Sequence, residues 1–378
     1  MKYVFFGISL FLVIMSSSCC SSSLVAKDAN SYVIEKLQKH DIIIFGEHHW
    51  VTEQMEFFGE MIPALYKNGV KCFALEFIDV NVQDLVDSLI YNDTYDVNLQ
   101  NTILAQSPMF LRKANENILY ELWKLQQQIG VENEKIKVLA LSPRPITLEG
   151  LLSGASDSLE IALVENFYHT YVKPIQPEIP KMDPDSLMAK FVLDCYMESK
   201  TKVAIYCGTY HGFTKVYQYE PEEYQGMREY KGRPLGQCMR RMGNILYDEL
   251  PGKVTNIAFM PFPIEAREDE SCSTPLDILL EKQGINKVGF DLNSPFVEDY
   301  ICKDLINPRM LPHFSVRNFY DGAIYLKPRK ELNTSLIENE WFINLLPFVA
   351  KNINLFGKEA GQNLFNAPLC DCWKNNNK

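Results

Sequence analysis

The sequence lacks an excess of basic residues: 37 Lys and Arg stand against 48 Asp and Glu, which gives a formal net charge of −11. No long block of Lys and Arg offsets this balance. Nucleic acid binding needs a basic face to meet the phosphates, so we do not expect nucleic acid as a partner. Internal repeats are also lacking. With 47 % apolar and 22 % charged residues, the chain has the composition of an ordinary globular protein.

A second long apolar run is lacking as well, since no segment after the N-terminus is long enough to span a bilayer. The N-terminus has Lys2, then the almost wholly apolar Tyr3–Met15, then three serines before Cys19. This order resembles a bacterial lipoprotein signal over residues 1–18, and cleavage would leave the Cys19 thiol to be acylated. Cleavage before Cys20 and a plain secretory signal are the alternatives.

The expected location and domain organisation follow from that signal. Residues 19–29 would form a short flexible tether, and residues 30–378 a single α/β domain with a helical insertion around 148–200. The protein would lie in the bacterial cell envelope, lipid-anchored at the outer membrane or the periplasmic face. It would contact the membrane through this anchor only.

The ten cysteines do not form a zinc-binding pattern. Cys370 and Cys372 make a C-x-C pair, whereas a structural zinc site needs four ligands with longer spacing. Cys72 and Cys207 lie within apolar runs and are expected to pack as small core residues. A disulfide from the C-x-C pair to another late cysteine stays open, because sequence does not give connectivity.

Seven short apolar runs predict β-strands. Several are continuous rather than alternating, which is typical of strands that are buried on both faces. The runs are Asp41–Phe45, Val70–Leu75, Ile136–Leu141, Lys202–Cys207, Val254–Met260, Lys287–Phe290 and Ala323–Leu326.

Longer segments with helical periodicity separate these runs. In Thr52–Tyr66 the apolar residues fall on one stripe. We expect Thr52 to cap the start of this helix and Asn68-Gly69 to end it. The other segments are Leu111–Gln128, Leu148–Tyr171, Ser186–Glu198, Leu235–Leu250 and Glu338–Lys351. The alternation predicts an α/β fold with a mostly parallel central sheet and helices on both faces.

Chemically active residues follow four of the predicted strands. They are Gly46-Glu47-His48-His49, Glu76, Ser142-Pro143-Arg144 and Gly208-Thr209-Tyr210-His211. Parallel sheets bind ligands at the carboxyl ends of their strands, so the four groups predict one convergent site. The alternative is that each group is satisfied locally, as a helix cap, a buried ion pair between Glu76 and Arg144, or a core histidine.

Two kinds of chemistry fit these residues. Glu47, His49, Glu76 and His211 could bind a divalent zinc, manganese or iron ion that activates water. Without a metal, one His or Glu could act as a general base for attack of water on an ester or amide. Arg144 or Tyr210 would then stabilise the developing oxyanion, and His48 is a further candidate for ligand binding.

The same motifs resemble the ChaN, Tiki and erythromycin-esterase superfamily. Gly46-Glu47-His48-His49 is similar to its G-E-x-H signature, with His49 as the motif histidine and His48 in the variable place. The further matching segments are Phe73–Glu76, Ala140–Arg144, Gly208–His211 with Lys215, Arg233–Gly236 and Asp321–Ile324. Members of the ChaN type tend to carry Asn where this chain has Ser142, and erythromycin esterases usually place the first His one residue later.

The resemblance covers roughly Asp41 to Lys327 and implies an α/β fold. Its members include haem-binding lipoproteins, Tiki-type proteases and macrolide esterases, so it implies either of two functions. One is hydrolysis of an ester or amide in a small molecule or a peptide. The other is haem binding at the open end of the sheet, with Tyr210 or a histidine as axial ligand.

The anchor gives a direct prediction. Mass spectrometry of protein extracted from membranes should show an N-terminus at Cys19 that carries acyl chains, more than one of them because stable attachment needs two membrane signals. A mature N-terminus elsewhere, or a protein that stays soluble without detergent, would contradict the lipoprotein interpretation.

Overall fold

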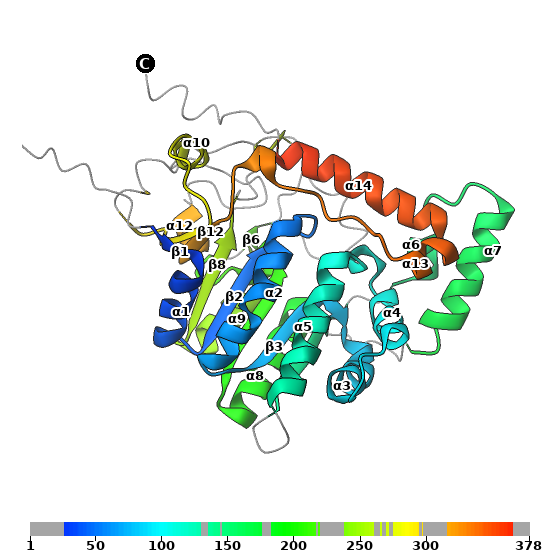
Figure 1. Cartoon of the computed structure of the whole chain (residues 1–378), viewed down its shortest axis with the longest axis horizontal. Coiled ribbons are helices and arrows are strands. Elements are labelled where there is room, and N and C mark those ends of the chain that lie inside the picture. Colours follow the sequence, from blue (N-terminus) through cyan, green and yellow to red (C-terminus); the bar gives the residue numbers. More distant parts are fainter. Residues whose placement is uncertain are drawn as a thin grey trace, which may run out of the picture.

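The computed structural model describes residues 26–129, 135–143, 146–175, 183–216, 218–219, 238–260, 265–266, 270–271, 275–294, 297 and 316–365. Within these residues the main feature is an eight-stranded sheet in the order β1-β11-β12-β8-β2-β5-β3-β4 (Figure 1). The strands are β1 (Lys27–Asp28), β2 (Ile42–Glu47), β3 (Val70–Asp79), β4 (Lys137–Ser142), β5 (Lys202–Gly208), β8 (Val254–Phe259), β11 (Val288–Asp291) and β12 (Gly322–Tyr325). The predicted fold class, a mostly parallel sheet with helices, is confirmed.

The six strands from β12 to β4 are parallel, and β2, β5, β3 and β4 are neighbours. These four correspond to the first four predicted apolar runs. The predictions missed that β11 runs antiparallel to β12, and that the two-residue strand β1 adds to it at the edge. β1 falls within the expected tether, whose residues 19–25 lie outside the described residues.

The central strands are apolar on both sides because helices cover both faces of the sheet. In β2, Ile43 and Phe45 pack into one cluster with residues of helix α2 (Thr52–Lys67) and helix α5 (Lys113–Ile129). Ile42 and Ile44 pack into another cluster with residues of α8 (Pro184–Ser199) and α9 (Met242–Glu249). Cys72 and Cys207 are buried in that second cluster, as predicted, and the Cys72 sulfur lies 2.9 Å from that of Cys195.

The remaining described elements surround this framework. The other helices are α1 (Ala29–Lys39), α3 (Gln83–Tyr91), α4 (Val97–Ala105), α6 (Leu148–Leu152), α7 (Ser158–Phe167), α10 (Pro275–Lys282), α12 (Val316–Phe319), α13 (Glu340–Leu345) and α14 (Pro347–Phe365). Two short two-stranded sheets pair β6 (Gln218–Tyr219) with β7 (Cys238–Met239), and β9 (Glu265–Ala266) with β10 (Glu270–Ser271). None of the helices within the described ranges is long and apolar enough to cross a membrane.

Three predicted helices differ from the structure. Leu148–Tyr171 is broken into α6, α7 and a π-helical turn at Tyr168–Val172, since Gly154 has a φ of +96° and Asp157 caps a new helix. Glu338–Lys351 is broken because Pro347 keeps the residue before it out of the helical region. In the predicted Leu235–Leu250, the described helix begins only at Met242.

Helix ends and missed helices show the limits of the local signals. Thr52 does not cap α2, because the N-cap is Val51 and no side chain caps that end. Asn68 is the C-cap, with Gly69 at φ +96°, as predicted. The helices α1, α3 and α4 were not predicted; α1 and α4 start behind the capping carboxylates of Asp28 and Asp96.

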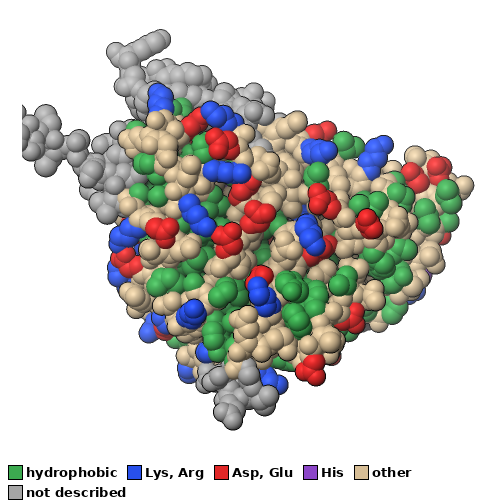
Figure 2. All heavy atoms as spheres, in the orientation of Figure 1, with side chains coloured by type: hydrophobic (Ala, Val, Ile, Leu, Met, Phe, Trp, Pro, Cys, Tyr) green, Lys and Arg blue, Asp and Glu red, His purple; other side chains and the backbone are tan. Residues whose placement is uncertain are grey.

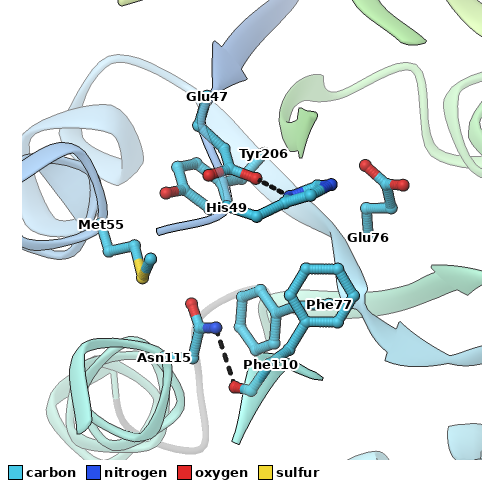
Figure 3. A pocket seen from close by; sticks show the side chains of 8 residues that line it. All are labelled: Glu47, His49, Met55, Glu76, Phe77, Phe110, Asn115 and Tyr206. Atoms are coloured by element: carbon cyan, nitrogen blue, oxygen red, sulfur yellow. Dashed lines mark hydrogen bonds and ion pairs between the residues drawn. The ribbon is translucent and has the colours of Figure 1, made fainter. Parts of the chain in front are cut away.

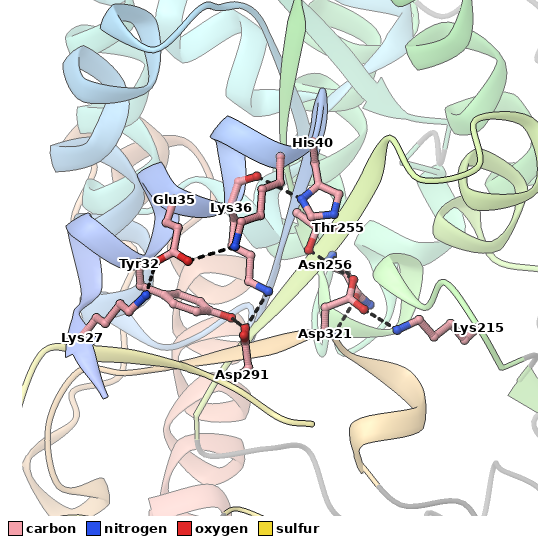
Figure 4. Close-up of polar contacts among 11 residues, drawn as sticks. Lys27, Tyr32, Glu35, Lys36, His40, Lys215, Thr255, Asn256, Asp291 and Asp321 are labelled. Atoms are coloured by element: carbon pink, nitrogen blue, oxygen red, sulfur yellow. Dashed lines mark hydrogen bonds and ion pairs between the residues drawn. The ribbon is translucent and has the colours of Figure 1, made fainter. Parts of the chain in front are cut away.

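A buried polar network holds the turn after β5 against β8 and β12 (Figure 4). The Asn256 side chain donates to the carbonyl oxygens of Gly212, at 2.7 Å, and Phe319, at 2.6 Å. Its Oδ1 accepts from the backbone N–H of Asp321 at 2.9 Å. The Asp321 carboxylate in turn accepts from Thr255, from the backbone of Asn256 and from Lys215. This network fixes the backbone of Gly212 beside His211.

On the outer surface, Figure 2 shows acidic and basic side chains interspersed over the visible face rather than gathered by sign. At the edge of the sheet, Tyr32 of α1 donates a hydrogen bond of 2.8 Å to Asp291, which also pairs with Lys36 (Figure 4). Burial and the neighbouring Asp291 raise the pKa of Tyr32, so its hydroxyl stays a donor. These contacts attach α1 to β11.

The Asn256 network predicts a stability effect. Asn256→Ala removes the side-chain donor to the carbonyls of Gly212 and Phe319 and one of the two acceptors of the Asp321 N–H, so it should lower the free energy of unfolding by about 2–4 kcal/mol. Urea denaturation followed by circular dichroism measures this. The control is Lys215→Ala, which removes a partly exposed partner of Asp321 and should cost less than about 1 kcal/mol. Equal losses in the two variants would contradict the role of Asn256.

Candidate functional site

The carboxyl ends of β2, β3 and β5 bring the predicted residues together. Glu47 ends β2, Gly208 ends β5 beside it, and Glu76 lies near the end of β3. The point at which a Cβ of Gly208 would stand lies 3.2 Å from His49 Nε2 and 3.4 Å from Glu76 Oε2. His49 and Glu76 therefore approach each other across Gly208, where a larger residue would not fit.

Glu47 and His49 form a dyad. His49 Nδ1 lies 2.5 Å from Glu47 Oε1 (Figure 3). The Glu47 side chain is 4 % exposed, whereas that of His49 is 25 % exposed. The ring of Phe110 packs edge-on against the His49 ring, with 4.9 Å between the two ring centroids. The buried carboxylate thus fixes the orientation of an imidazole whose other nitrogen faces Glu76 and Gly208.

A small cavity lies beside the dyad. It is lined by Glu47, His49, Met55, Glu76, Phe77, Phe110, Asn115 and Tyr206 (Figure 3). Three buried polar atoms of this lining have no protein partner in the described part of the chain: Glu47 Oε2, Asn115 Oδ1 and Tyr206 Oη. Buried polar groups are usually satisfied, and water fills polar cavities of this kind. The volume that the centre of a water molecule can occupy in this cavity is about 10 Å³, which is close to the minimum for one bound water.

His211 lies between two carboxylates. Its Nδ1 lies 2.6 Å from Asp185 Oδ1, and its Nε2 lies 3.2 Å from Glu76 Oε1. Arg241 donates to the other oxygen of Asp185 at 2.8 Å, and the N–H of Gly208 donates to Glu76 Oε2 at 2.6 Å. The chain of contacts from Arg241 to Glu76 therefore fixes the Glu76 carboxylate from behind.

The charges decide the protonation of His211. Burial alone would lower its pKa, but the carboxylates of Asp185 and Glu76 outweigh burial and raise the pKa above 6.5. Burial would raise the pKa of Asp185, but the charges of His211 and Arg241 outweigh burial and hold this pKa far below its ordinary value. The two carboxylates therefore favour the protonated form of His211, in which each ring nitrogen can donate to one of them.

A metal ion in the expected site would have to displace this proton from His211. A metal ligand needs a free nitrogen lone pair, and both nitrogens of His211 face carboxylates within hydrogen-bonding or ion-pair distance. Across the described residues, no group of three or more His, Cys, Asp or Glu is arranged to hold a metal ion. Glu47, His49, Glu76 and His211 do converge, but as two hydrogen-bonded pairs rather than as four ligands around a common point.

The other predicted site residues lie at different distances from this centre. His48 directly follows β2, and its backbone N–H donates a hydrogen bond of 2.7 Å to Gln54 Oε1. Tyr210 is half-buried and packs edge-on against Phe213, away from the lining of the cavity. Arg144 lies outside the described residues, as do Cys19 and the segment Arg233–Gly236.

Sequence reasoning missed several residues of the site. Tyr206 was treated only as part of an apolar strand, although alternation along β5 puts it on the same face as Glu47. Burial, followed by the charge of Glu47, raises its pKa far above 10, so it remains a phenol. Asp185 and Asn115 come from helices, where a single polar residue gives no signal of function. Asp185 was detectable only through its contact with His211.

The His211 pair predicts how stability depends on pH. The pKa of His211 is higher in the folded protein than in the unfolded chain. Protonated His211 therefore stabilises the fold fully below pH 6.5, and this stabilisation is lost as the pH rises through the folded-state pKa. His211→Gln should therefore cost on the order of 3 kcal/mol at pH 6 and progressively less at higher pH. Urea denaturation of both proteins from pH 6 to 9 measures the difference, with His40→Gln as a control for a general effect of the change. A difference that grows with pH would contradict the assignment.

Comparisons with known proteins give the fold and no closer relation. No family model matches the sequence, and no curated protein matches it. Solved structures do match. One is an erythromycin esterase mutant in its open conformation, with 12 % identity, 78 % of this chain and 92 % of that chain covered, and a TM-score of 0.46. Another is ChaN of Campylobacter jejuni, described with cofacial heme binding, with 16 % identity, 62 % and 87 % coverage, and a TM-score of 0.36.

A third match is to the crystal structure of a succinoglycan biosynthesis protein. It covers 81 % of this chain and 92 % of that chain, with 9 % identity and a TM-score of 0.51. At this identity the likeness concerns the fold alone. The matched structures include the two kinds of protein that the sequence motifs resemble. The chain has the α/β fold that it shares with the succinoglycan biosynthesis protein.

Proposed function

We propose that this protein is a hydrolase that attacks an ester or amide with a water molecule activated by the Glu47–His49 dyad. The observation that carries the proposal is the 2.5 Å contact between a buried carboxylate and a partly exposed imidazole, beside a cavity that fits about one water. General base catalysis needs an imidazole that is oriented by a carboxylate and can accept a proton from a nearby water.

His49 takes the proton of the water in this mechanism. With Nδ1 held by Glu47, the Nε2 atom is the acceptor, and it lies on the Glu76 side of the ring. As the proton arrives, the ring becomes an imidazolium. The buried Glu47 carboxylate stabilises that charge and keeps the ring in its orientation. His49 can then return the proton to the leaving alkoxide or amine.

Glu76 positions the reacting water. Its carboxylate is fixed by His211 and by the N–H of Gly208, so it can accept a hydrogen bond from a water next to His49. Because the two carboxylates raise the pKa of His211, it serves in this mechanism as a fixed donor rather than as a second base. Tyr206, a phenol whose hydroxyl lines the cavity, can donate to the same water.

Metal and haem are the alternatives that the sequence raised. Among the described residues, no three or more His, Cys, Asp or Glu are grouped so as to hold a metal ion, and the proposed steps do not involve a metal. The described cavity fits about one water, so haem, like an ester or amide substrate, would have to bind outside it. Tyr210, the expected axial ligand, does not line that cavity.

The lipid anchor is part of the proposal. Acylation of Cys19 would keep the hydrolase at the bacterial cell envelope, where its substrate would be a small molecule or a peptide. The chemistry of the dyad does not depend on this location.

The dyad predicts a loss of activity on mutation. His49→Ala and Glu47→Gln should each lower kcat for an ester or amide substrate by about 10²–10⁴-fold, because the first removes the base and the second removes the carboxylate that orients and stabilises it. A panel of chromogenic acyl esters and peptide amides, assayed with protein lacking a His tag, measures this. His40→Ala is the matched control, since His40 lies at the amino end of the same strand and should leave kcat unchanged.

Activity that survives in both dyad variants would contradict the proposal. Two additions to the same samples test the alternatives. Activity that is abolished by a chelator and restored by zinc or manganese would favour a metal enzyme. A stoichiometric Soret shift with haemin that is lost in Tyr210→Phe, in a protein without hydrolase activity, would favour haem binding.

A further inference from the structure

Arg112 is a buried cation that, within the described residues, makes hydrogen bonds to backbone carbonyls and to no carboxylate. The residue lies just before α5, and its side chain is fully buried. Its Nε donates to the carbonyl of Met109 at 2.9 Å, and its Nη1 donates to the carbonyl of Ser335. The third nitrogen, Nη2, has no hydrogen-bond partner in the described part of the chain. A buried charge that meets only carbonyls is costly, so the free nitrogen indicates a place for an anion.

A second buried donor without a described partner lies next to it. Trp50 follows the catalytic His49 directly, and its indole Nε1–H is buried and unpaired within the described residues. The point at which a Cβ of Gly357 would stand lies 3.4 Å from Trp50 Nε1 and 3.4 Å from Arg112 Nη2. Two unsatisfied donors thus converge beside one glycine of α14, the helix that runs across the top of the molecule in Figure 1.

The backbone holds these two donors in place. Ser335 donates its N–H to the carbonyl of Trp50 at 2.7 Å and accepts from Arg112 through its own carbonyl. One residue therefore connects both donors and fixes the distance between them. Trp50 is half-buried, and Phe356, which packs edge-on against it at 5.2 Å, is 54 % exposed. This side of the pair lies close to solvent.

We propose that Arg112 and Trp50 form a binding site for a carboxylate, beneath Gly357 of α14 and beside the catalytic dyad. Arg binds carboxylates through charge-assisted hydrogen bonds, and the indole N–H adds a directed neutral donor. Together they donate to the two oxygens of one carboxylate group, whose negative charge adds to that of Glu47 near Arg112. This assignment rests on the proposed hydrolase function. Because the site lies next to His49, we infer that the substrate is an ester or amide that carries a free carboxylate.

Arg112 remains cationic at neutral pH, as the site requires. Burial lowers its pKa to about 10, and the charge of Glu47 acts in the opposite direction. The negative charge of Glu47 lies near enough to act on Arg112, so the carboxylate site and the dyad share one electrostatic environment.

Gly357→Ala offers a variant that blocks the site by displacing the Trp50 ring. Its added methyl group would lie 2.9 Å from Trp50 Cδ1 and would occupy the space between the donors. Gly357 lies within helix α14, where Ala is a better helix former than Gly. Gly59→Ala is the matched control, because that helical glycine would gain only an ordinary contact of 3.6 Å with Ile118. Arg112→Met tests the charge directly, and unfolding of this variant is detected by circular dichroism.

The binding test follows the indole N–H signal of Trp50 by NMR, assigned with Trp50→Phe, as sodium acetate replaces sodium chloride at constant ionic strength. We expect a saturable downfield shift in the wild type and in Gly59→Ala, and at least a tenfold weaker affinity in Gly357→Ala. No saturable shift, or the same affinity in Gly357→Ala, would overturn the site. Tighter binding of phosphate than of acetate would also overturn the assignment to a carboxylate.

The activity test uses matched esters with and without a free carboxylate. We expect kcat/KM to favour the carboxylate-bearing ester at least tenfold, and the preference to disappear in Gly357→Ala but not in Gly59→Ala. If neither ester is hydrolysed but acetate binds, the hydrolase proposal fails and the anion site stands. If both esters are hydrolysed equally by the wild type, the substrate assignment fails and the hydrolase proposal stands.

Discussion

The parallel register of β2, β5 and β3 is the constraint on which the rest of the structure depends. Because these strands run in the same direction, Glu47, Gly208 and Glu76 come to one edge of the sheet although they are far apart in the sequence. Gly208 then has a second function, since only a residue without a side chain lets His49 and Glu76 approach each other across it. The geometry of the site is therefore a consequence of strand order and of one glycine.

Placing charges at this edge has an energetic cost that the structure offsets in two different ways. Around His211, the offset is full charge pairing, with Asp185 and Glu76 on either side and Arg241 beyond. The charges of His211, Asp185, Glu76 and Arg241 thus pair with one another, and both ring nitrogens of His211 are engaged. At Glu47 and His49 the pairing is incomplete, since one oxygen of Glu47 lacks a protein partner in the described residues and the imidazole is partly exposed. A carboxylate with one unsatisfied oxygen beside a cavity makes this the more reactive of the two groups.

The sequence predicted the strands and the convergent site because both depend on simple patterns. Continuous apolar runs identified the central strands, and polar residues directly after them identified Glu47, Glu76 and His211. The partners of these residues could not be predicted in the same way. Asp185 and Asn115 come from helices packed against the sheet, and Tyr206 is apolar in pattern but polar at its tip. The protonation of His211 also required the structure, because it depends on two carboxylates brought together by tertiary packing.

The central claim is that Glu47 and His49 act as one catalytic unit, and a double-mutant cycle on kcat/KM tests it most directly. Glu47→Gln, His49→Ala and the double variant would be compared with the wild type on one hydrolysed ester. Residues that act as a unit are strongly non-additive, so the double variant should be no slower than His49→Ala alone. If the two effects multiply instead, the residues act independently, and the account of the dyad is contradicted.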